Sequence, residues 1–169
     1  FNGCRSLTSD KFNITGWHMS SKTVGFEIRF FRDCKSLTEL DLSSWVFDEQ
    51  VTIEGFNTTF YGLTNCQTIN LSSWNLVDNN KSSSFGFADC PNLVNLNLGN
   101  NITLKSVHAG AFGSDISLSP ESAVSIFNAL ADLSGTSSQT LKLPSQVIAR
   151  LTSDQISIAT NKNWSITAE

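Results

Sequence analysis

The sequence contains two closely similar segments, Leu-Asp-Leu-Ser-Ser-Trp ending at Trp45 and Ile-Asn-Leu-Ser-Ser-Trp ending at Trp74. Placing Leu40 over Ile69 and then over Leu96 aligns a third copy, with offsets of 29 and 27 residues. Reading upstream in this register gives further columns that are apolar in every copy. A repeat of this length constrains the fold more than any other feature, because each copy must form the same structural unit.

The shared pattern is Phe-x-x-(Cys/Leu)-x-x-(Leu/Cys)-x-x-(Leu/Ile)-x-Leu. Steps of three favour a short helix or 3₁₀ turn with one buried side. The closing Leu-x-Leu has a period of two, which favours a short strand with its leucines inward. Phe1, Cys4 and Leu7 open a fourth copy, which becomes irregular where Asp10 and Phe12 replace the expected Leu-x-Leu.

A single unit of this kind cannot bury its apolar side alone, whereas stacked units share a continuous core. The pattern therefore predicts an α/β repeat solenoid, a stack of short strands and short helices or 3₁₀ turns. Residues 1–114 are expected to form about four rungs, the first irregular, and residues 115–169 an α+β segment that closes the open end. Both parts are expected to form one continuous domain, itself a fragment of a longer chain. In this register Leu42, Leu71 and Leu98 are nearly fully buried.

The stretches FRDCKSLTELDLSSW, FADCPNLVNLNL and FNGCRSLT resemble the BspA-like leucine-rich repeats of bacterial surface proteins. The tail that begins LSPESAVSIFNAL is similar to the segment closing such arrays in Bacteroidales-type proteins. The resemblance covers nearly the whole chain and implies a leucine-rich-repeat-like fold. Three features depart from the family: Cys66 occupies a leucine column, the first rung is irregular, and residues Val46 to Asn57 are a long insertion.

The tail also carries local signals of its own. Ser119 followed by Pro120 is a helix start, and Gly135 is the expected stop. The segment Gln139–Leu143 predicts a strand, and the segment Pro144–Leu151 a short helix. Thr152 and Gln155 form the two ends of a capping box that starts another helix. The stretch Trp-Ser-Ile-Thr from Trp164 predicts a final short strand.

Composition narrows the range of partners. The chain is 40% hydrophobic but only 15% charged, with a formal net charge of −4 and a pI near 5.1. Lysine and arginine are scattered, so no basic patch is expected to hold nucleic acid or an anionic membrane. No apolar stretch approaches the roughly 20 residues that span a bilayer. Neither a nucleic-acid partner nor insertion into a membrane is therefore expected.

The search for catalytic chemistry is negative, and we expect no enzyme activity, no cofactor and no metal. His18 and His108 have no second ligand at metal spacing, and each is expected in a loop or on the surface. The four cysteines lack any C-x-x-C spacing, which argues against zinc. We expect all four to be small buried hydrophobic residues. A disulfide between Cys4 and Cys34 remains open, since both occupy one column on adjacent rungs.

Trp45 and Trp74 share a column and are expected to pack in the core rather than to contact a sugar. Any ligand site is instead expected on the strand face opposite the leucines, where polar columns recur. Its candidate residues are Glu39, Asp41, Ser43, Thr68, Asn70, Ser72, Asn95 and Asn97. The alternative to a site is a merely solvated face.

By analogy with the resembled family, the predicted function is a non-catalytic binding or adhesion module of a bacterial cell-surface or secreted protein. Its expected partner is a host protein or a cell-surface glycan. The alternative is a structural or receptor-contacting module of a phage tail or fibre, located on the virion. The oligomeric state stays open.

Overall fold

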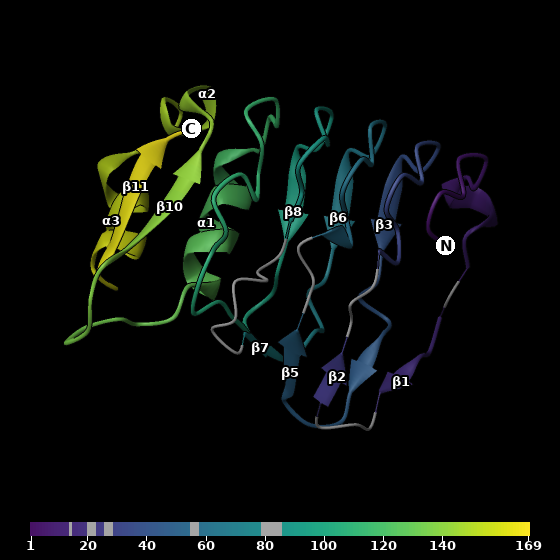
Figure 1. The fold of residues 1–169 in the computed structure, drawn as a ribbon, viewed down its shortest axis with the longest axis horizontal. Coiled ribbons are helices and arrows are strands. Elements are labelled where there is room, and N and C mark those ends of the chain that lie inside the picture. The colour runs from purple at the N-terminus through teal and green to yellow at the C-terminus, as the bar shows by residue number, and fades with distance from the viewer. Residues whose placement is uncertain (14, 20–22, 26–28, 55–57, 79–85) are drawn as a thin grey trace.

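The computed structural model describes residues 1–13, 15–19, 23–25, 29–54, 58–78 and 86–169. Figure 1 shows short strands side by side in two rows, one above the other, with the helices gathered toward the C-terminal end. The N-terminal turns lie at the opposite end of the molecule.

The upper row is a parallel three-stranded sheet of β3 (Glu39–Asp41), β6 (Thr68–Asn70) and β8 (Asn95–Asn97). Its register pairs Leu40 with Ile69 and Ile69 with Leu96, as the alignment of the three sequence copies predicts. The burial pattern of β3 and β8 is exposed–buried–exposed, which follows from the alternation of side chains along a strand.

The lower row holds a parallel sheet of β2 (Thr23–Gly25), β5 (Val51–Glu54), β7 (Leu76–Asp78) and β9 (Ile102–Thr103). A further pair joins β1 (His18–Met19) to β4 (Val46–Phe47), also in parallel. The predicted insertion from Val46 onward thus supplies β4 and β5. Its last residues, 55–57, lie outside the described part of the chain.

The buried core includes residues from both rows and from the C-terminal elements, and the repeated apolar columns make up much of it. Leu42, Leu71 and Leu98 are at most 1% exposed, which confirms the predicted burial. The rings of Phe31, Phe60 and Phe87 stack in turn, with interplanar angles of 10° and 5°. Stacked aromatic rings add to the stabilisation that burial gives.

The predicted fold class, a leucine-rich-repeat-like solenoid with a closing segment, is wrong. Over the residues that the structure describes, the protein is a small α/β protein with short parallel sheets and three α-helices. The described strands fall into separate sheets, and the sheet that carries the aligned copies has only three strands of three residues. Agreement in register within that sheet does not extend to a continuous stack.

The steps of three that favoured a helix or 3₁₀ segment form turns instead. The backbone explains why: Asp33 and Asp89 have φ of 58° and 56°, in the left-handed region. Gly3 and Gly62 hold the aligned position in the other copies, each with φ of 73°. A right-handed helix cannot pass through such a residue, so each copy turns two residues after its phenylalanine.

The C-terminal elements match their local signals. Helix α1 (Pro120–Ala129) begins at Ser119, whose hydroxyl accepts a hydrogen bond from the Ser122 nitrogen. Strand β10 (Gln139–Leu143) pairs in parallel with β11 (Trp164–Ala168), and α2 (Ser145–Ile148) lies between β10 and α3 in the sequence. Helix α3 (Ser153–Thr160) has the predicted capping box of Thr152 and Gln155.

One boundary differs from expectation, because α1 ends at Ala129 and not near Gly135. Leu130 is extended and forms a parallel bridge with Leu104. The ammonium group of Lys162 then donates to the carbonyl oxygens of Phe127, Asn128 and Leu130 at 3.0, 2.8 and 2.8 Å. The last carbonyls of a helix need partners from outside it, and Lys162 supplies a charged donor to this end of α1.

Candidate functional site

Helix α1 lies along the outer edge of β8, and two serine hydroxyls of the helix form hydrogen bonds with the backbone of that strand. The Ser122 hydroxyl accepts from the Leu96 nitrogen at 2.8 Å and donates to the Val94 carbonyl at 2.9 Å. Ser125 accepts from the Leu98 nitrogen at 2.9 Å. The nitrogens of Leu96 and Leu98 and the Val94 carbonyl, which another strand would use, are therefore already paired with side chains.

At the opposite edge of the sheet, one more serine does the same for β3. The Ser9 hydroxyl, at the start of the 3₁₀ turn η1 (Ser9–Lys11), accepts from the nitrogens of Thr38 and Glu39, both at 3.0 Å. It also donates to the Glu39 carbonyl at 2.8 Å. Short side chains thus occupy positions on both edges of the three-stranded sheet.

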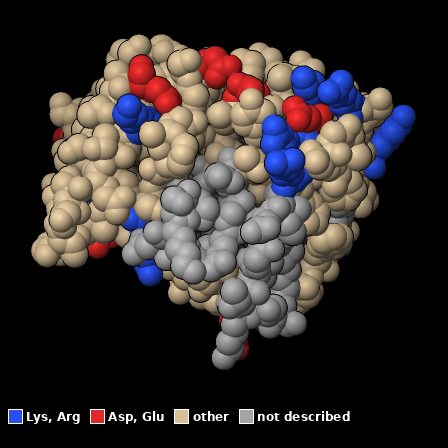
Figure 2. Space-filling model, viewed as in Figure 1, with Lys and Arg blue, Asp and Glu red and all other residues tan. Residues whose placement is uncertain are grey.

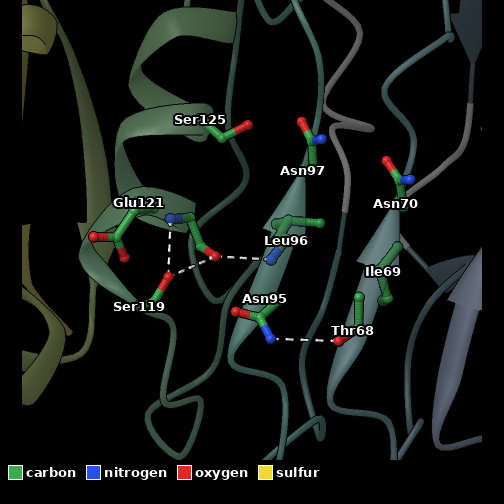
Figure 3. A pocket seen from close by; sticks show the side chains of 10 residues that line it. Thr68, Ile69, Asn70, Asn95, Leu96, Asn97, Ser119, Glu121 and Ser125 are labelled. Atoms are coloured by element: carbon green, nitrogen blue, oxygen red, sulfur yellow. Dashed lines mark hydrogen bonds between the residues drawn. The ribbon is translucent and has the colours of Figure 1, made fainter.

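A groove of about 510 Å³ runs between the sheet and α1. Figure 3 shows β6 and β8 on one side and the helix on the other, with the side chains that line the space between them. Its lining residues are Thr68, Ile69, Asn70, Asn95, Leu96, Asn97, Ser119, Glu121, Ser122 and Ser125. A second hollow of about 340 Å³ shares Asn97, Glu121 and Ser125 and continues past Gly99. The two hollows together follow the length of the helix.

Asn70 and Asn97 line the groove, and their side chains also stabilise the turns that end their strands. Asn70 Oδ1 accepts from the Ser72 nitrogen at 3.2 Å, and Asn97 Oδ1 accepts from the Gly99 nitrogen at 2.9 Å. Asp41 Oδ1 makes the same bond to the Ser43 nitrogen at 2.9 Å. Each is an Asx turn that ends its strand. These polar positions recur because the turn requires an oxygen there.

In each asparagine the turn holds the side-chain oxygen Oδ1 and leaves the side-chain nitrogen Nδ2 available to a ligand. In the described part of the chain, Nδ2 of Asn70 and of Asn97 donates to no protein acceptor. Figure 3 shows the two carboxamides side by side at the ends of their strands. The Asn95 amide is different, since it donates to the Thr68 hydroxyl at 3.4 Å.

Five of the eight predicted site residues line these hollows, namely Thr68, Asn70, Ser72, Asn95 and Asn97. The other three, Glu39, Asp41 and Ser43, belong to the same columns but line neither hollow. Sequence reasoning missed the contribution of α1, which supplies Glu121 and Ser125. The signal was a pair of serines three residues apart on one helix side, next to an acidic first turn.

The lining of the two hollows carries one formal charge, the carboxylate of Glu121, and no lysine, arginine or histidine. Glu121 lies in the first turn of α1, at the end of the helix that carries a partial positive charge. Figure 2 shows a face that is mostly uncharged, with acidic and basic side chains gathered mainly along one edge. The groove therefore suits a neutral ligand better than an anionic one.

The cysteines are outside this groove. Cys34, Cys66 and Cys90 are buried as predicted, and burial raises the pKa of the Cys66 and Cys90 thiols to about 12. Cys4 corrects the expectation that all four are buried, because it is exposed, and it forms no disulfide with Cys34. No group of three or more potential metal ligands occurs among the residues that the structure describes.

The tryptophans in the shared column pack in the core, as predicted. Trp45 and Trp74 are 1% and 2% exposed, and their rings stack with centroids 5.9 Å apart. Trp17 stacks on the other side of Trp45 at 4.8 Å and is 41% exposed. Both histidines are exposed, and His18 Nδ1 lies 3.2 Å from a carboxylate oxygen of Asp48.

No helix within the described ranges is both long and apolar enough to cross a membrane. Comparison with models of protein families, with curated proteins and with solved structures finds no match for this chain.

Proposed function

We propose that this protein is a non-catalytic binding module whose ligand occupies the groove between α1 and the β3–β6–β8 sheet. The observation that carries the proposal is the donor pair in that groove. Within the described chain, Nδ2 of Asn70 and of Asn97 has no protein acceptor. The oxygen Oδ1 of the same side-chain amide is held in a turn. Two donors that are held in position and that no protein group uses form a preorganised recognition surface.

The chemistry of the lining supports a hydroxyl-rich or amide-bearing partner. The groove offers amide, hydroxyl and carboxylate groups and lacks a cation. Polar groups placed at fixed positions give a site its orientation and specificity. A cell-surface glycan fits this lining, and adhesion at a bacterial cell surface or in a secreted protein is the role we propose.

A glycan array tests the proposal, with Glu121→Arg as the groove variant. The arginine side chain fills the helix side of the groove and reverses its charge. Asp154→Arg is the matched control, because both carboxylates are exposed and each lies in the first turn of its helix. Both changes therefore carry the same small helix-dipole cost.

We expect the parent protein and Asp154→Arg to bind the same spots and Glu121→Arg to lose them. An array that gives no signal with the parent protein argues against the proposed function. Equal binding by Glu121→Arg places the site outside the groove.

A further inference from the structure

We propose that the groove recognises the acetamido group of a neutral saccharide, with Asn70 and Asn97 as the specificity-determining donors. The inference rests on the proposed function and deepens it, because it names the class of ligand.

The Asx turns decide which atom each side chain presents. Since Oδ1 of Asn97 is held by the Gly99 nitrogen at 2.9 Å, the group left for a ligand is an N–H donor. The same holds for Asn70 and the Ser72 nitrogen. β6 and β8 are hydrogen-bonded neighbours that pair Asn70 with Asn97, so the two asparagines stand on strands about 4.8 Å apart. A ligand that matches them presents acceptors.

The best acceptor on a neutral sugar is the carbonyl oxygen of an acetamido group. Unlike a hydroxyl, this oxygen cannot donate, so it distinguishes an asparagine amide from a carboxylate. The acetamido N–H is in turn a donor, and Glu121 supplies an acceptor within the same groove. Saccharides that carry a carboxylate or sulfate are disfavoured, because Glu121 repels them and no cation lines the groove.

An extended peptide also carries amide carbonyl groups, but the sheet offers it no edge beside the helix. A peptide that adds to a sheet uses free backbone groups along an edge strand. On β8 the nitrogens of Leu96 and Leu98 are already bonded to Ser122 and Ser125. The side chains of the groove remain, and they suit a ligand recognised by its substituents.

The structure itself supplies a substitution that keeps the turn and changes only the presented atom. Asp41 occupies the position of Asn70 and Asn97 in the neighbouring strand and bonds the Ser43 nitrogen at the same 2.9 Å as Asn97 bonds Gly99. Asn97→Asp and Asn70→Asp are therefore expected to keep the fold while turning a donor into an acceptor. Asp41→Asn, outside the groove, is the matched control.

The test measures binding of the N-acetylglucosamine tetramer, with the glucose tetramer and the deacetylated glucosamine tetramer as ligand controls. We expect the acetylated tetramer to bind at least about tenfold more tightly than either control. Asn97→Asp is expected to weaken that binding at least about tenfold, because one hydrogen bond is replaced by two facing acceptors. Asp41→Asn is expected to bind within about twofold of the parent. Melting temperatures check that all three variants remain folded.

Several results overturn the inference. One is equal binding of the glucose tetramer, and another is tighter binding of the deacetylated tetramer. Unchanged binding by Asn97→Asp, equal binding of an N-acetylated tetraalanine peptide, or no binding of the acetylated tetramer overturns it too. If the array signal is lost in Glu121→Arg while Asn97→Asp binds normally, the proposed function stands and the donor assignment fails.

Discussion

The Ser122 hydroxyl lies 2.8 Å from the Leu96 nitrogen and 2.9 Å from the Val94 carbonyl oxygen, so one side chain both accepts from and donates to the edge of β8. Ser122 is only 4% exposed, which leaves little water to replace it. A helix thus takes the place of the next strand, and the groove exists because that helix stands beside the sheet.

Replacing Ser122 with alanine is expected to lower the free energy of unfolding by about 1–3 kcal/mol, because the buried Leu96 nitrogen loses its partner. The Val94 carbonyl keeps its hydrogen bond from the Ser119 nitrogen at 2.8 Å. Ser157→Ala on α3 is the control, since among the described residues that hydroxyl bonds only the Ser153 carbonyl, within its own helix. Chemical denaturation measures both. Equal stability of the two variants would contradict the role given to Ser122.

Leu71→Ala is expected to cost about 2–5 kcal/mol, because the side chain is fully buried and its removal leaves a cavity. Val94→Ala serves as the comparison, since Val94 is 37% exposed. That change is expected to stay near 0.5 kcal/mol, as is usual for surface positions. A small effect at Leu71, measured by urea unfolding, would show that the described register is wrong.

The sheet also depends on a close approach at Gly99, whose φ is +66°. A Cβ at this position would meet the carbonyl group of Ser72 in the neighbouring chain segment. Gly135 has φ of +82° but open space around it, so Gly135→Ala should show only the left-handed backbone cost of about 1–2 kcal/mol. Gly99→Ala is expected to be clearly more destabilising. Similar unfolding curves would argue against the close approach.

The buried thiols make stability sensitive to alkali. Burial raises the pKa of Cys66 and Cys90 to about 12 from an ordinary value of 9.0, so the folded state holds the neutral thiols. Their contribution is fully present below pH 9 and is lost as pH rises toward 12. The free energy of unfolding should therefore fall over this range, and less steeply in a Cys66→Ala/Cys90→Ala variant. Equal slopes would contradict the assignment.

Cys4 is exposed, whereas Cys66 and Cys90 are buried. A thiol reagent at pH 8 should modify the folded protein first at Cys4, because that side chain is exposed and the thiolate is the reactive form. Peptide mapping after a short reaction identifies the modified residue. Early modification of Cys90 would mean that the core opens readily.

The sequence predicts the strands well where burial alternates, as at Leu40, Ile69 and Leu96, because the pattern of one strand is set by which side is apolar. It predicts α1 and α3 from their caps, since a cap is a local hydrogen bond. The turn after Phe31 was missed because aspartate at the left-handed position looks like an ordinary polar residue. The end of α1 was missed because Lys162, far along the chain, fixes it.

Part of the candidate site could likewise be predicted from the sequence, and part could not. Its strand side was predicted, since Asn70 and Asn97 alternate with buried residues. The helix side could not be placed, because the packing of α1 against β8 depends on long-range contacts through Ser122 and Ser125. Nor does the sequence show that the side-chain oxygen of Asn97 accepts a hydrogen bond within a turn. That bond decides that Asn97 offers an N–H donor to the groove.

The most direct test of the account is an NMR titration of the side-chain amide signals with the N-acetylglucosamine tetramer. The Nδ2 signals of Asn70 and Asn97 are predicted to shift in proportion to the bound fraction. Those of Asn65 and Asn92 are predicted to stay in place, because each already donates to a backbone carbonyl at 2.7 Å. Unchanged signals from Asn70 and Asn97 at saturation would contradict the account.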